Sequence, residues 1–366
     1  MPSILSEAFK SHPAQLHDHH LDFESLNHVP DTHIWPFIHE YPSDDVTCSV
    51  ESVPVIDLMH PNVANLIGNA CEKWGVFHVV NHGVPMRILK EVESQGKHLF
   101  LLPTQQKIKA ARTPNGVAGY GCARISSFFP KLMWSEGFTI LGSPEEHARQ
   151  LFPRDCKTFC DVIEEYKREM KKLSIRLMWL MLVSLGIKRE DLKWAKEFEQ
   201  GSCAVLQLNS YPPCPDPYKA MGLAAHTDST LLTILHQNNI SGLQVLKDGV
   251  EWVTVPPIGG ALVVNVGDLL HILSNGRYPS ILHRAVVHHT RHRLSIAYLY
   301  GPPTNIQISP LSKLIDHKNP PLYRPVSWTE YLGAKATYFN NALSSIRLYD
   351  PKNETSFPNG GEMSRG

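Results

Sequence analysis

The sequence has no excess of charge of one sign and no hydrophobic run long enough to cross a bilayer. Its 366 residues include 35 basic and 35 acidic residues, so the formal net charge is zero. A chain with this balance has no general electrostatic attraction to nucleic acid or to a membrane surface. The most hydrophobic stretch, residues 177–186, is too short for a transmembrane helix. We expect it to form a buried helix, and we expect neither nucleic acid nor a membrane as a partner.

Paired cysteines are also missing. The seven cysteines are odd in number and scattered, and none has the Cys-x-x-Cys spacing of a zinc ribbon or the pattern of a disulfide framework. Cys156 and Cys160 lie one helical turn apart, which is typical of packing on a helix face. The N-terminus lacks the basic region and apolar run of a secretory signal. We therefore expect a reducing compartment, the cytoplasm or also the nucleus, since no targeting element separates the two.

The chain divides by pattern into four regions. Residues 1–50 are rich in His, Pro and Asp without a sustained period, which predicts a flexible arm. Its cluster from His17 to His20 could hold a metal adventitiously, but a solvated tail is the simpler interpretation. Residues 51–200 are predicted to be mostly helical and to pack on a core domain at 201–340. A polar tail, residues 341–366, ends the chain.

The periodicity of the chain predicts its elements. Helices are expected at 63–74, 86–101, 157–185 and about 327–339, and short strands at 53–58 and 75–80. Residues 116–153 are loop-rich and aromatic. Further short strands are predicted at 204–211, 230–236, 243–247, 252–255, 261–266, 281–287 and 293–300. Strands at this spacing favour a jelly roll over a parallel sheet, so we expect an α+β fold: a distorted double-stranded β-helix flanked by helices.

Two imidazoles and one carboxylate form the most informative pattern. His226 and Asp228 are two positions apart, which places both side chains on one side of an extended chain. His283 follows 55 positions after Asp228 (283 − 228), enough chain to cross a barrel and return. Such a set is the facial triad of non-haem Fe(II) oxygenases. An isolated His-x-Asp means little, and its weight here comes from the motifs that accompany it.

Two further pairs have the same spacing. Asn209 and Tyr211 precede the triad, and Arg293 and Ser295 follow it. The guanidinium fork and the hydroxyl suit a carboxylate, and Tyr211 adds a phenolic donor. A dicarboxylate that chelates the metal at one end and meets Arg293 at the other would bridge the site. 2-Oxoglutarate has that shape.

With these motifs, the chain resembles the plant 2-oxoglutarate- and Fe(II)-dependent dioxygenases over about residues 50 to 340. The same resemblance rests on residues 53–57, 75–85 and 209–214. It implies Fe(II), 2-oxoglutarate and O₂, with ascorbate as reductant. It also implies that His226, Asp228 and His283 are the catalytic iron ligands. The residues implied to bind 2-oxoglutarate are Asn209, Tyr211, Arg293 and Ser295.

A narrower resemblance rests on residues 119–140 and the following Gly142-Ser-Pro. This segment is similar to that of the gibberellin 3-beta-dioxygenases. It implies hydroxylation of gibberellin precursors at C3, giving bioactive gibberellins with release of succinate and CO₂, by a protein expected to be monomeric. Gibberellin 20- or 2-oxidation, oxidation of another plant metabolite such as a flavonoid, and a non-catalytic sensor on the same fold stay open.

A pocket for a rigid, largely apolar polycyclic acid needs aromatic walls and a few polar groups. The expected walls come from the 119–140 segment: Tyr120, Ile125, Phe128, Phe129, Trp134 and Phe138. Its cationic and hydroxyl side chains are candidates to meet the substrate carboxylate: Arg124, Ser127 and Lys131. The opposite side of the pocket is expected to be lined by Leu243, His271 and Tyr300.

Overall fold

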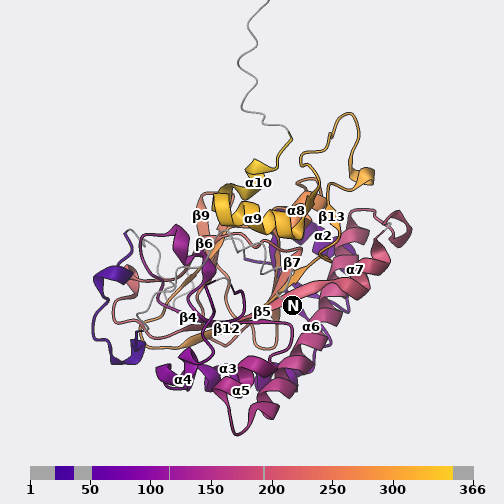
Figure 1. Ribbon diagram of the computed structural model, residues 1–366. Coiled ribbons are helices and arrows are strands. Elements are labelled where there is room, and N and C mark those ends of the chain that lie inside the picture. Colours follow the sequence, from indigo (N-terminus) through magenta and orange to yellow (C-terminus); the bar gives the residue numbers. More distant parts are fainter. Residues whose placement is uncertain (1–20, 37–51, 115, 193, 349–366) are drawn as a thin grey trace, which may run out of the picture.

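Two β-sheets form the centre of the molecule (Figure 1). The computed structural model describes residues 21–36, 52–114, 116–192 and 194–348. The large sheet has the order β1 (Val55–Asp57), β2 (Val76–Val80), β10 (Leu262–Val266), β7 (Leu232–Gln237), β12 (Arg293–Gly301), β5 (Cys203–Tyr211), β4 (Glu136–Leu141) and β3 (Gly119–Gly121). The small sheet has the order β6 (Met221–His226), β11 (His283–Val286), β8 (Leu243–Lys247) and β9 (Glu251–Thr254). A separate pair consists of β13 (Gln307–Ile308) and β14 (Val326–Ser327).

Helices cover the outside of the sheets. In chain order they are α2 (Val63–Trp74), α3 (Met86–Leu101), α4 (Thr104–Ile108), α5 (Glu145–Leu151), α6 (Cys156–Ser184), α7 (Ala195–Gly201), α8 (Asp268–Leu273), α9 (Trp328–Tyr338) and α10 (Ala342–Ser345). The short 3-10 turn η3 (Arg124–Phe128) lies between β3 and β4. Within the described ranges, none of the helices combines the length and the apolar character needed to span a membrane.

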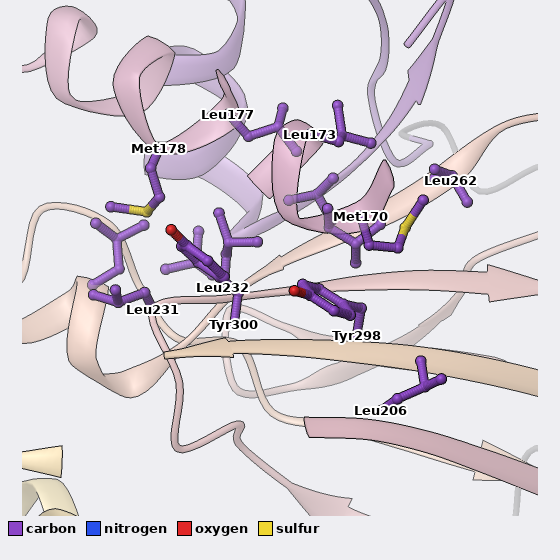
Figure 2. Close-up of a cluster of buried hydrophobic side chains, with 14 of the residues drawn as sticks. Met170, Leu173, Leu177, Met178, Leu206, Leu231, Leu232, Leu262, Tyr298 and Tyr300 are labelled. Carbon is purple, nitrogen blue, oxygen red and sulfur yellow. The ribbon is translucent and has the colours of Figure 1, made fainter. Parts of the chain in front are cut away.

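The long helix α6 packs against the outer face of the large sheet. It begins after Asp155, whose carboxylate accepts a hydrogen bond from the Thr158 backbone N–H. Its apolar side chains recur at helical spacing and are buried against the sheet. Figure 2 shows this cluster, in which Met170, Leu173, Leu177 and Met178 of α6 gather with Leu206, Leu232, Leu262, Tyr298 and Tyr300 of the large sheet. Burial of this apolar surface holds the helical layer on the sheet.

The alternation of side chains along β12 separates the two faces of the large sheet. Leu294, Ile296, Tyr298 and Tyr300 belong to the core under α6. The side chains between them face a cavity inside the two sheets: Arg293, Ser295, Ala297 and Leu299. Because residues two apart in a strand share a face, one strand supplies both the core and the site.

This architecture confirms the predicted α+β fold with a double-stranded β-helix flanked by helices. The helices predicted at 63–74 and 86–101 have those bounds, and the long helix spans 156–184. The segment 116–153, expected to be loop-rich, also contains β3, β4 and α5, and β6 was not predicted as a strand. The cysteines in the described ranges form no disulfide.

The N-terminal arm differs from its prediction in the part that the structure describes. Residues 21–36 pack on the body of the protein: the Trp35 indole N–H donates to the Leu132 carbonyl at 2.8 Å, and Phe23 lies edge-on to Trp134 with 4.8 Å between centroids. The apolar side chains spaced along this segment explain the packing. The cluster from His17 to His20 lies outside the described residues. The domain boundaries stay a prediction, and the large sheet includes strands from both sides of residue 200.

Candidate active site

The three predicted metal ligands meet where the small sheet opens to the cavity. His226 ends β6 and His283 begins β11, and the two residues pair directly across these strands. Asp228 follows two residues after His226, and its Oδ1 lies 3.6 Å from Nε2 of His226 and 3.7 Å from Nε2 of His283. One ligand atom from each residue lies within 4.8 Å of the others. The predicted grouping is therefore confirmed.

The surroundings of the triad prepare it for a metal ion. Nδ1 of His226 lies 2.8 Å from the Ala224 carbonyl, and Nδ1 of His283 lies 3.2 Å from the Ile281 carbonyl. Donation from each Nδ1–H leaves the Nε2 lone pair for a metal. Burial lowers the pKa of His226 to about 4, and the neighbouring His283 acts in the same direction. At neutral pH this imidazole is therefore uncharged and able to coordinate.

The carboxylate of Asp228 is also suited to metal binding. Burial raises its pKa, but the two histidines, together with Thr233 and Lys335, outweigh that effect, so the pKa lies below its usual value. Its Oδ2 is buried without a hydrogen-bond partner in the described residues. An unsatisfied buried carboxylate oxygen is costly unless a cation pairs with it. The donor set of two imidazoles and one carboxylate therefore fits Fe(II).

The four predicted 2-oxoglutarate residues lie together on β5 and β12. Arg293 pairs with Tyr211 and Ser295 pairs with Asn209, so all four side chains point to the same face, into the cavity. Arg293 is 2% exposed and its guanidinium lies over the Tyr211 ring, 4.9 Å from the centroid. Burial lowers the pKa of Arg293, and Tyr211 partly offsets this effect.

The Arg293 guanidinium is incompletely satisfied. Its Nη2 donates to Oε1 of Gln237 at 2.9 Å, while Nε and Nη1 are buried without a partner in the described part of the chain. A buried cation with free donors suits a carboxylate, because a charge-assisted bidentate pair would satisfy it. The group fits the distal carboxylate of 2-oxoglutarate.

A cavity of about 580 Å³ connects the triad, the four residues expected to bind 2-oxoglutarate (the 2-oxoglutarate anchor) and a mostly apolar outer part. This size is in the usual range for a small-molecule site. Five of the predicted substrate residues line it: Arg124, Ile125, Ser127, Phe128 and Leu243. At its edge the rings of Phe128 and Phe339 stack, with 4.6 Å between centroids. Phe129 packs edge-on against Phe339 but does not line the cavity.

Besides Phe129, six further predicted substrate residues do not line the cavity. Tyr300 and Phe138 belong to the hydrophobic core on the opposite face of the large sheet because of their position in the strand alternation. Trp134 is fully buried beside Phe23, and Lys131 is bound to the Asp31 carbonyl at 2.7 Å. The other two have their polar groups satisfied elsewhere: Tyr120 donates to Glu136, and His271 contacts the Tyr278 carbonyl and the Tyr323 hydroxyl.

The sequence analysis also missed side chains that line the cavity. Arg112, Thr139 and Gln207 lie at its polar wall. Strand alternation from Asn209 would have identified Gln207, and Thr139 pairs with Gln207 across β4 and β5. Helix α9 and the turn after it contribute a further wall of Trp328, Leu332, Lys335, Ala336 and Phe339. No motif marked that helix, whose contacts arise only from the tertiary structure.

Comparison with known proteins agrees with this geometry. The model of the 2OG-Fe(II) oxygenase superfamily matches residues 202–302, and that of the non-haem dioxygenase in morphine synthesis N-terminal matches residues 53–158. Gibberellin 3-beta-dioxygenase 1 of Pisum sativum is 58% identical over 360 residues, covering 96% of each chain. Gibberellin 3-beta-dioxygenase 1 of Arabidopsis thaliana is 54% identical, covering 95% of this chain and 99% of that protein.

Solved structures share the fold. The crystal structure of JOX2 in complex with 2OG, Fe and JA has a TM-score of 0.74 and 32% identity, covering 88% of this chain and 95% of that one. The dioxygenase for auxin oxidation from rice has a TM-score of 0.68 and 25% identity, covering 81% of this chain and 100% of that one. Fe(II), held by His226, Asp228 and His283, and 2-oxoglutarate are the cofactor and cosubstrate of this chain. The chain belongs to the 2OG-Fe(II) oxygenase superfamily and, within it, to the family of the gibberellin 3-beta-dioxygenases.

Proposed function

We propose that this enzyme hydroxylates gibberellin precursors at C3, in the 3-beta position, and so produces bioactive gibberellins. 2-Oxoglutarate is consumed and succinate and CO₂ are released. The observation that carries this proposal is the near full-length identity of 58% with a gibberellin 3-beta-dioxygenase. The intact triad beside a largely apolar cavity supports it, because that cavity suits a rigid polycyclic substrate.

The residues of the chain mainly bind and orient the reactants. Iron, when bound, supplies oxygen activation coupled to oxidative decarboxylation of the cosubstrate. Arg293, Ser295, Tyr211 and Asn209 hold 2-oxoglutarate from the large sheet, opposite the triad on the small sheet. The carbon nearest the triad is the one that reacts, so the cavity walls determine which position is hydroxylated.

The substrate is proposed to lie between η3 and the small sheet. Ile125, Phe128 and Leu243 supply apolar contacts, and Arg124 and Ser127 add polar groups at the cavity wall. Burial lowers the pKa of Arg124 to about 10, so its guanidinium stays charged at neutral pH. We place the reaction in a reducing compartment, the cytoplasm or nucleus, in keeping with the unpaired cysteines of the described ranges.

Product identification by mass spectrometry tests the proposal. Purified protein is supplied with Fe(II), ascorbate, 2-oxoglutarate and a panel of gibberellin precursors, with a flavanone as an unrelated substrate. We expect a C3-hydroxylated gibberellin and an equal amount of succinate. Oxidation at another carbon would instead assign gibberellin 20- or 2-oxidation, and oxidation of the flavanone alone would reject a gibberellin substrate. Absence of succinate with every compound would favour a non-catalytic sensor.

A further inference from the structure

Arg112 is a buried cation at the cavity wall that neither the triad nor the 2-oxoglutarate anchor uses. It follows α4, and its backbone N–H donates to the Tyr120 carbonyl at 2.8 Å, which fixes the start of the side chain beside β3. The side chain is 4% exposed and lines the cavity. Nη1 donates to the Cys122 carbonyl at 3.0 Å and Nη2 to Oγ1 of Thr139 at 2.8 Å.

The hydrogen-bond partners of Arg112 are neutral. They use two of the five N–H donors of the guanidinium, and Nε is buried without a partner among the residues that the structure describes. Within the described ranges, no carboxylate forms an ion pair with it. Burial lowers its pKa to about 10, and the nearby Arg124 contributes to this shift. The group is therefore charged at neutral pH, although a buried charge without a counter-ion is costly.

The other cations that line the cavity have assigned partners, and among them Arg124 donates to the Gly116 carbonyl at 2.5 Å. Lys335 lies 3.0 Å from Oδ2 of Asp268, and Arg284 donates to Gln244 and lies over the Trp252 ring. The formal charges of Fe(II), Asp228, 2-oxoglutarate and Arg293 sum to zero. Cosubstrate binding therefore leaves the positive charge of Arg112 without compensation.

Arg112 lies at a different part of the cavity from Arg293. Thr139 Oγ1 donates to Oε1 of Gln207 at 2.5 Å, and Nε2 of Gln207 donates to Oδ1 of Asn209 at 3.0 Å. These hydrogen bonds lead from Arg112 through Thr139 of β4 to Gln207 of β5, so Arg112 lies near the Gln207 level of the sheet. The Gln207 and Tyr211 positions are four residues apart, roughly 13 Å along a strand. A carboxylate at Arg112 is therefore separate from the one that Arg293 receives.

We propose that Arg112 binds the carboxylate of the substrate and that Thr139 holds its guanidinium in the orientation for binding. This inference rests on the proposed function, in which the substrate is a polycyclic acid. The carboxylate accepts from the free N–H groups of Arg112 and supplies the missing counter-charge. Anchored at this end, the apolar skeleton extends past the walls of η3 and β8 toward the triad.

Equilibrium binding of a 3-deoxy gibberellin acid and of its methyl ester tests this role. The protein is loaded with Mn(II) and 2-oxoglutarate without oxygen, and dissociation constants are measured by calorimetry. Wild-type protein should prefer the acid by about 10-fold or more, since a hydrogen bond to a charged group contributes that much. In Arg112→Met the ratio of the dissociation constant of the ester to that of the acid should fall to near one. The acid loses affinity in this variant, whereas the ester does not.

Three further variants separate binding of the carboxylate from folding. Arg112→Lys keeps the charge but not the planar fork, and Thr139→Val keeps the charge but loses the orienting hydrogen bond, so both should give intermediate ratios. Arg176→Met removes an exposed arginine on α6 that donates to the Leu58 carbonyl at 2.7 Å, outside the cavity, and should keep the wild-type ratio. If Arg112→Met does not fold, the Lys and Val variants carry the test.

The outcomes for this role and for the proposed function are distinguishable. An unchanged ratio in the Arg112 variants, together with C3 hydroxylation by the wild type, would overturn the role of Arg112 and leave the proposed function intact. Equal loss of acid and ester affinity would also overturn it, since the residue would then be structural. A wild type that oxidises another carbon, but whose acid preference depends on Arg112, would support the carboxylate site and reject C3 hydroxylation.

Discussion

At the scale of single residues, the carboxylate of Asp228 joins the two histidines into one metal site. Asp228→Ala removes the oxygen that lies 3.6 and 3.7 Å from the imidazole nitrogens. We expect iron binding and succinate production to fall at least ~100-fold, in line with the loss of a direct ligand where even outer partners matter 10–100-fold. Metal content and turnover measure this. Asp161→Ala, at an exposed ion pair on α6, is the control. Normal iron content with normal turnover in Asp228→Ala would remove Asp228 from the ligand set.

Arg293 is the second position where a single side chain is expected to determine binding, in this case the binding of 2-oxoglutarate. Arg293→Met removes a buried guanidinium whose Nε and Nη1 have no partner in the described residues. The dissociation constant of 2-oxoglutarate should rise by about 30-fold or more, because a buried charge pair would be lost. Calorimetric titration of the Mn(II)-loaded protein measures it. Arg277→Met, at an exposed ion pair with Glu72, should have no effect. An unchanged 2-oxoglutarate affinity in Arg293→Met would show that another group holds the cosubstrate.

At the scale of elements, the packing of α9 against the large sheet depends on one glycine of β12. A Cβ built on Gly301 would come within 2.3 Å of the Trp328 ring. Trp328 begins α9, lines the cavity and donates to the Ser229 carbonyl at 2.7 Å. Gly301→Ala must therefore displace the indole, and we expect a loss of about 1–3 kcal/mol in unfolding free energy and a raised substrate KM.

Gly333 provides the matched control for this change. It lies within α9, and a Cβ there would meet no heavy atom within 4 Å. Gly333→Ala should be neutral or stabilise by roughly 0.5–1 kcal/mol, because alanine favours a helix over glycine. Urea unfolding and steady-state kinetics on both variants measure the difference. Equal effects of the two substitutions would contradict the prediction that α9 packs closely on β12 only because residue 301 is a glycine.

Strand alternation determines which parts of the site could be predicted from the sequence. The spacing of Arg293 and Ser295 correctly placed both on the cavity face. The same alternation, extended along β12, puts Tyr300 on the opposite face, so its assignment to the substrate pocket was wrong. The assignment of Phe138, on β4, to the substrate pocket was wrong for the same reason. Aromatic character alone indicates burial, and it does not distinguish the hydrophobic core under the helices from the cavity.

Other parts of the site had no local signal. Lys335 and Phe339 reach the cavity because α9 folds back over the sheets, and Arg112 reaches it through a bridge to the β3 region. These contacts join segments far apart in the sequence. The triad was predictable because metal chemistry restricts its residue types and their spacing. Apolar and cationic wall residues are not restricted in this way.

At the scale of the whole molecule, the number and spacing of the strands predicted the core of the fold. The order in which the strands pair within the sheets could not be predicted from the sequence. The strands β1 to β4 come from a region predicted to be mostly helical, yet they occupy both ends of the large sheet. β2 pairs antiparallel with β10 across more than half of the chain, which no local pattern specifies. The N-terminal region is therefore part of the sheet as well as its helical cover.

Buried and half-buried histidines in several parts of the molecule predict sensitivity to acid in the metal-free protein. Burial is the main cause that lowers the pKa of each of these groups: His78, His82, His147, His226 and His271. In the unfolded chain these side chains bind protons near pH 6.5, and in the folded protein only at lower pH. Between these values the unfolded state binds more protons, so stability falls as pH falls. For His226 this window extends from about 6.5 to about 4.

The unfolding free energy of the apoprotein, measured with urea in the presence of a chelator, should therefore be lower at pH 5 than at pH 7.5. Each group that is protonated only on unfolding contributes at most about 1.4 kcal/mol per pH unit. His78→Asn should reduce the slope, whereas His317→Asn, at an exposed loop position, should leave it unchanged. Bound metal should steepen the dependence, because protons compete for the imidazoles that coordinate it. Equal stability of the apoprotein at the two pH values would mean that these histidines become protonated within the folded state.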